Sequence, residues 1–270
     1  MPEKRDRSSK FKKIAGVVLS IIVLMAWVGV AIFVSQYILG WLMILLIGVE
    51  AFQKPFMIAI YSALSYVMAM VLIILVPLLY KKLKTPDAKK SKQKFIDLKK
   101  LKDDLGLKGL PTWTDLGLAP VGFFVYLILA FLLTTLFSQF AWFDAGEAQD
   151  VGFSLFMSRP EKLIAFLTLV VVAPIAEEII FRGFLYGKMR SKLAVATSNK
   201  ISMILSIVLT SLLFGIMHMQ WNVGVNVFAM SIVLCTLREI TGTIHAGILL
   251  HMLKNGIAFY LLYVLGMGLV

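Results

Sequence analysis

The 270-residue chain is 60% hydrophobic, and its mean hydropathy is +0.89. Apolar runs of spanning length recur along it, which excludes a soluble globular domain and predicts an all-α, polytopic transmembrane helix bundle. The net charge of +12 arises from Lys and Arg clusters beside these runs, without interleaved aromatic residues, so no nucleic-acid partner is expected. The single cysteine, Cys235, excludes an intramolecular disulfide and a cysteine-based metal site.

The apolar runs predict seven spans, with eight as the alternative count because one connection, at residues 220–222, is polar but very short. The predicted spans are residues 14–34, 56–80, 118–140, 163–186, 201–219, 222–237 and 243–268. We expect residues 37–49, which follow the first span, to pack along the membrane interface or to bend at Gly40. We divide the chain into residues 1–117, with two spans and a lysine-rich segment, and a core at 118–270.

Basic residues before the first span and lysines throughout residues 81–108 mark the cytoplasmic side. The loop near residues 144–161 is acidic, which agrees with an external position. We therefore expect an integral protein of a bacterial cell membrane, with a cytoplasmic N-terminus and an external C-terminus. Within the lysine-rich segment, Ile96, Leu98, Leu101 and Leu105 recur near helical spacing, which indicates either a short amphipathic helix on the membrane surface or a solvated linker.

Three charged residues, Glu177, Glu178 and Arg182, interrupt the fourth span. A charge at the bilayer centre costs roughly 2.5–3.5 kcal/mol, so each needs a partner or a function. Glu178 and Arg182 are four residues apart and can pair on one helix face. Glu177 points about 100° away and is left available as a general base. Pro174 can kink the helix there and free backbone groups to face a polar cavity. Alternatively, the three charges form a salt-bridge cluster that only fixes helix packing.

The only histidines are His218, His245 and His251, all in apolar surroundings. His218 follows Phe214 by four residues, and His251 precedes Asn255 by four, so each pair shares a helix face. We interpret His245 as a packing or cavity-lining residue.

These residues could serve either of two chemistries. A hydrolytic set would use a carboxylate and imidazoles to activate water, with donors for an oxyanion; its members would be Glu177, His218, His251 and Asn255. Alternatively, Glu177, His218 and His251 could hold a divalent metal such as zinc, with water in an open position. Spacing does not decide between them. Neither a His-Glu-x-x-His zinc signature nor a Gly-x-Ser-x-Gly elbow is present.

The three motifs, in this order, resemble those of the CAAX protease and bacteriocin-processing intramembrane proteases, also called the type II CAAX prenyl endopeptidase or Abi family. They read Glu177-Glu178-Ile-Ile-Phe-Arg182, Phe214-Gly-Ile-Met-His218 and His251-Met-Leu-Lys-Asn255, within a region of about 163–255. The resemblance implies a membrane helix bundle that hydrolyses peptide bonds.

Carried over to this chain, the resemblance implies that Glu177 activates water with help from His218. His251 and Asn255 would stabilise the oxyanion or position the water. Glu178 and Arg182 would hold the glutamate helix in place, with Phe214 supporting the site. The family is described both as metal-dependent and as glutamate-dependent, so both remain open.

The sequence thus predicts an intramembrane endopeptidase that contacts membrane lipids and acts on a prenylated CAAX tail or on a bacterial signalling or bacteriocin-type peptide. One alternative is a non-catalytic bacteriocin-immunity or adaptor protein of the same fold. Another is an ion-coupled or proton-coupled transporter, which the lack of two matching halves with interrupted helices disfavours.

Counting residues along the helices places Glu177 and His251 near mid-membrane but His218 closer to the external end. The proposed site therefore requires a fifth helix that starts later than Ile201, or a polar turn at residues 220–222 buried inside the bundle.

Overall fold

The computed structural model describes residues 2–84, 97–147, 153–154 and 157–266. These residues form helices, turns and loops, and seven of the helices are long and apolar enough to cross a membrane. The predicted all-α bundle with seven spans is confirmed. The seven run over Lys12–Ile47, Pro55–Tyr80, Trp113–Phe137, Arg159–Leu193, Asn199–Ile216, Trp221–Thr241 and His245–Val264.

Several spans are assembled from shorter helical segments, some of them π-helical. The N-terminal part contains α1 (Pro2–Ile47), α2 (Val49–Phe52), α3 (Pro55–Met70), η1 (Val71–Leu75), α4 (Val76–Lys84), α5 (Leu98–Asp104) and α6 (Trp113–Phe137). The remainder contains α7 (Arg159–Phe166), η3 (Leu167–Val172), α8 (Ala173–Glu178), η4 (Ile179–Tyr186), α9 (Gly187–Leu193), α10 (Asn199–Ile216), α11 (Trp221–Thr241), α12 (His245–Phe259) and η5 (Tyr260–Val264).

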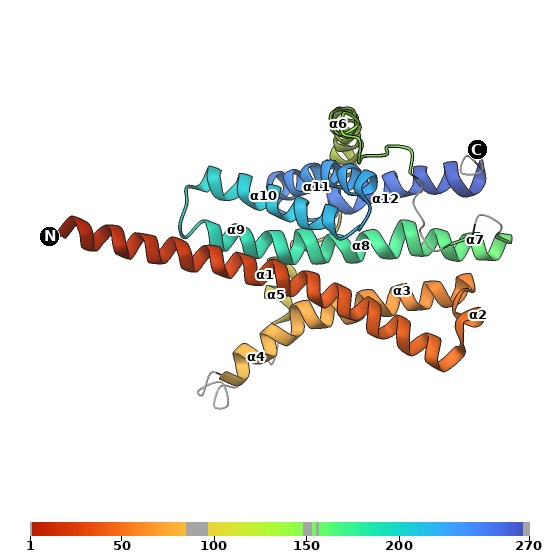
Figure 1. Cartoon of the computed structure of the whole chain (residues 1–270), viewed down its shortest axis with the longest axis horizontal. Helices are drawn as coiled ribbons and strands as arrows, with labels where there is room; N and C mark the ends of the chain where they lie inside the picture. The colour runs from red at the N-terminus through yellow and green to blue at the C-terminus, as the bar shows by residue number, and fades with distance from the viewer. Residues whose placement is uncertain (1, 85–96, 148–152, 155–156, 267–270) are drawn as a thin grey trace.

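The segments α7 to α9 form one long central helix (Figure 1). Helices α1 and α3 pack on one side of it, and α10, α11 and α12 pack on the other. Helix α6 covers the outer side of α11 and α12. The side chains buried between these layers are large and apolar, among them Ile180, Leu185, Met230, Leu234 and Leu250. This arrangement encloses the charged part of the central helix in protein.

Two capping boxes make spans start earlier than predicted. Asp115 and Thr112 bond reciprocally at the start of α6, so this helix begins at Trp113 rather than residue 118. Ser158 and Glu161 do the same for α7, which begins at Arg159. Each box satisfies amide groups that would otherwise lack a partner at a helix start.

The first helix does not end near residue 34, nor does it bend at Gly40. It continues to Ile47 and ends at Gly48, whose φ of 80° breaks the helix. Gly40 faces α3, and a Cβ there would meet the Tyr61 ring at 3.4 Å, an ordinary van der Waals contact. The expected bend was wrong because a glycine inside a packed helix adds little reason to leave it.

The expected amphipathic helix is present as α5. Asp97 caps it by accepting a hydrogen bond from the amide of Lys100. Leu105, just after the end of α5, is 7% exposed and belongs to the protein core. The half-buried Leu101 packs against the same core. A short helix is therefore present in this stretch, and its position on the membrane surface stays a prediction. Residues 85–96, including Ile96, lie outside the described residues.

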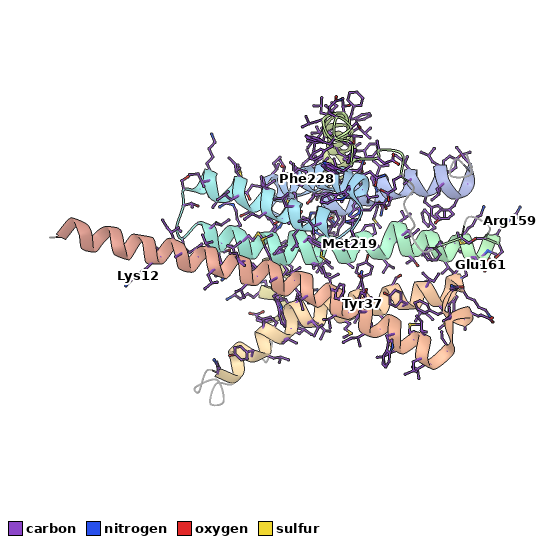
Figure 2. The ribbon with its side chains drawn as sticks, viewed as in Figure 1. Lys12, Tyr37, Arg159, Glu161, Met219 and Phe228 are labelled. Atoms are coloured by element: carbon purple, nitrogen blue, oxygen red, sulfur yellow. The ribbon has the colours of Figure 1, made fainter. Side chains whose placement is uncertain are left out.

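The turn between α10 and α11 accounts for the depth of His218. Because α10 starts at Asn199, the explanation that required a start later than Ile201 is wrong. Helix α10 has 18 residues, close to the predicted length, whereas the central helix has 35, and Figure 2 shows Met219, in the turn after α10, level with the middle of the central helix. Gln220 and Asn222 are half-buried, and both donate to the backbone carbonyl of Glu147.

Candidate active site

The pair predicted from i,i+4 spacing is present at the centre of the bundle. Arg182 Nη1 lies 2.9 Å from Glu178 Oε1, and both side chains are fully buried. The Arg182 guanidinium also lies over the Phe214 ring, 4.4 Å from its centroid. The ion pair and the aromatic face together compensate the two charges for the loss of solvent.

Glu178 has a second partner that helix spacing did not predict. His251 Nδ1, on α12, lies 3.1 Å from Glu178 Oε1. The carboxylate favours a proton on Nδ1, which in the neutral ring leaves Nε2 as an acceptor. That Nε2 lies 3.8 Å from Oε2 of Glu177. Glu178 therefore orients the imidazole toward the first glutamate.

Glu177 is the more accessible of the two glutamates, with 18% of its side chain exposed. Its Oε1 accepts a hydrogen bond from the Tyr66 hydroxyl at 2.7 Å. Tyr66 belongs to α3, far from every motif in sequence, and the pattern of the second span gave no sign of its role. Only the packing of α3 on the central helix brings the two side chains together.

A cavity of about 210 Å³ opens beside Glu177. Tyr66 and His218 line it together with Glu177. His218 Nδ1 lies 2.9 Å from the Phe214 carbonyl, which fixes the hydrogen on Nδ1, and the two rings stack edge to face at 5.0 Å. The Phe214 ring also contacts the His251 ring at a centroid distance of 6.2 Å. Phe214 thus packs against both imidazoles.

Asn255 bonds to the backbone of the central helix. Its Nδ2 donates to the Leu169 carbonyl at 2.9 Å. In the π-helical register of η3, the Ala173 amide bonds to Thr168, five residues back. The next amide would bond to Leu169, but residue 174 is a proline and has no N–H. Asn255 supplies the hydrogen bond that Pro174 cannot make.

His245 lies away from these groups. It is 9% exposed, and its Nε2 lies 3.3 Å from the Lys108 carbonyl, which agrees with a packing role. Within the described part of the chain, no three His, Cys, Asp or Glu side chains converge as metal ligands.

The comparison with known families agrees with the motifs. Residues 159–257 match the family model described as type II CAAX prenyl endopeptidase Rce1-like. No curated protein and no solved structure matches the chain. The matched region contains the central helix and the helices that carry all three motifs. The family predicted from those motifs, that of the type II CAAX prenyl endopeptidases, is thereby confirmed over this region.

Proposed function

We propose that the protein is an intramembrane endopeptidase that hydrolyses a peptide bond with water activated by Glu177. One observation carries the proposal: Glu177 borders a cavity, with one carboxylate oxygen bonded to Tyr66 and the other facing Nε2 of His251. The family match supports a protease, and the seven apolar helices support a site within the membrane. The catalytic core is proposed to lie in residues 118–270.

In the proposed reaction, a water molecule donates one hydrogen to Glu177 Oε2 and the other to His251 Nε2. The separation of 3.8 Å lets one water contact both acceptors at normal hydrogen-bond lengths. Its lone pairs then face the cavity. As the water oxygen attacks the peptide carbonyl carbon, Glu177 takes a proton and later delivers it to the leaving nitrogen when the C–N bond breaks.

The remaining residues support these steps. The Phe214 carbonyl orients His218, whose Nε2 can donate to the developing oxyanion when the ring is protonated. Glu178 and Arg182 keep His251 in place. Asn255, assigned to the oxyanion or the water by resemblance, is proposed instead to act through the helix that carries Glu177, because its amide bonds to Leu169.

The substrate is proposed to be a prenylated CAAX tail or a bacterial signalling or bacteriocin-type peptide. The proposed orientation puts the N-terminus and residues 81–108 in the cytoplasm. The N-terminus, the end of α4 and the end of α9 lie toward the same end of the bundle (Figure 1), which supports this orientation because all three carry Lys or Arg.

The experiment compares Glu177→Ala, Glu178→Ala, His218→Ala and His251→Ala for cleavage of a prenylated CAAX peptide and of an unprenylated peptide, with membrane insertion of each variant measured. Glu177→Ala is expected to insert normally and to lose cleavage. If this variant inserts normally and cleaves at the wild-type rate, the proposed function is wrong. Wild-type protein that binds either peptide without cleaving it would indicate an immunity or adaptor role.

A further inference from the structure

The proposed general base depends on a residue outside the region that matches the family. Tyr66 lies on α3, whereas the match begins at residue 159. We propose that Tyr66 is a positioning residue for Glu177: its hydroxyl fixes the carboxylate so that Oε2 faces the reacting water. This inference rests on the proposed function and assigns part of the working site to the N-terminal helices.

The first support is the chemistry of the two glutamates' partners. Glu178 bonds to a cation, Arg182, which balances its charge. Glu177 bonds to a neutral phenol at 2.7 Å. A neutral donor can hold a carboxylate in one orientation without pairing its charge. The adjacent glutamates are thus held by partners suited to different tasks.

The second support is that the two carboxylate oxygens of Glu177 face different partners. The hydroxyl of Tyr66 bonds to Oε1, while Oε2 lies toward His251. A glutamate has several rotatable bonds, and without a fixed partner its carboxylate would sample other rotamers in the adjacent cavity. A hydrogen bond to a charged acceptor is among the stronger ones in proteins. Tyr66 therefore restricts the base to the oxygen that faces the proposed water.

The third support is the rigidity of the element that carries Tyr66. Helix α3 packs on α7, η3 and α8 of the central helix, and on α1. Five residues before Tyr66 on the same helix, the Tyr61 hydroxyl donates to the Gln36 carbonyl of α1 at 3.1 Å. Tyr61 and Gln36 line the same cavity as Glu177. Contacts with α1 and with the central helix therefore hold α3, and with it Tyr66, in place beside Glu177.

The test compares Tyr66→Phe with Tyr126→Phe, a control that loses a buried tyrosine hydroxyl bonded to Asn226, outside the cavity. We expect Tyr66→Phe to lower kcat about tenfold or more, with KM and thermal stability unchanged. Tyr126→Phe should keep the wild-type kcat. If Tyr66→Phe does not insert, Tyr66→Met, which also removes the hydroxyl, is expected to show the same loss.

A double-mutant cycle separates positioning from a structural role. Asp at position 177 is too short to keep the bond to Tyr66, so Tyr66→Phe should have no further effect on kcat in a Glu177→Asp background. Equal kcat values for Tyr66→Phe and Tyr126→Phe, or additive effects in the cycle, would overturn the inference. If the Tyr66 inference fails in this way but Glu177→Ala is still inactive, the proposed function stands. Full activity in Glu177→Ala would instead remove the proposed function itself.

Discussion

His251 Nδ1 lies 3.1 Å from Glu178 Oε1, the same oxygen that Arg182 Nη1 contacts at 2.9 Å. A glutamate expected only to hold a helix therefore joins that helix to α12. The chain Arg182, Glu178, His251 ends at an imidazole nitrogen that faces Glu177. The Glu178 carboxylate thus both pairs with Arg182 and orients His251 toward Glu177. Mutations at Glu178 and at Glu177 should therefore have different effects on stability and activity.

Glu178→Gln is expected to reduce both stability and activity, whereas Glu177→Gln should reduce activity alone. The first change leaves the fully buried Arg182 without a counter-charge, and breaking a buried ion pair costs about 3–5 kcal/mol. Glu177 is partly exposed, and among the described residues no Lys or Arg forms a salt bridge with it. Thermal unfolding in detergent, measured beside peptide cleavage, checks the difference. Equal melting temperatures for the two variants would contradict it.

Gly247→Ala is expected to lower activity about tenfold or more, because a Cβ there would lie 3.0 Å from Glu178 Oε2 and displace the carboxylate that orients His251. Gly256→Ala, on the same helix, is the matched control. Its Cβ would meet Val170 Cγ1 at 3.6 Å, an ordinary contact. Cleavage rates of the two variants, normalised to inserted protein, check the prediction, and a similar rate for both would count against it.

Asn255→Ala is expected to destabilise the protein by about 1–3 kcal/mol, since the Leu169 carbonyl loses its side-chain donor. In the Pro174→Ala background the loss should be smaller, because the restored amide can bond to Leu169 in the η3 register. The measurement is a double-mutant cycle of thermal unfolding and cleavage. Additive effects on stability would show that the two residues do not share this carbonyl.

Treatment with a chelator such as EDTA or 1,10-phenanthroline is expected to leave cleavage unchanged. The reason is the geometry of the candidate ligands, since no three of them converge in the described part of the chain. The test measures initial rates before and after chelation, with a zinc peptidase as a positive control. Loss of activity that added zinc restores would show a metal requirement and overturn the mechanism.

Much of the fold could be predicted because bilayer insertion imposes a strong pattern on sequence. Long apolar runs set the spans, and basic clusters between them set the expected orientation. The predicted helix boundaries were wrong where local contacts determine where a helix begins or ends. The first helix continues through Gly40 and ends at Gly48, whose φ is positive, and capping boxes at Thr112 and Ser158 move two helix starts. The level of the turn at Met219 followed from the length of α10.

The sequence by itself determined the family match over residues 159–257, the seven spans and the Glu178–Arg182 pair, because these depend on composition, motif order and residues one helical turn apart. Only the tertiary structure decided which partners the remaining polar groups have. It brought Tyr66 to Glu177, His251 to Glu178 and Asn255 to Leu169. These contacts join helices distant in the chain, and helical periodicity specifies which face a residue occupies but not which other helix covers that face.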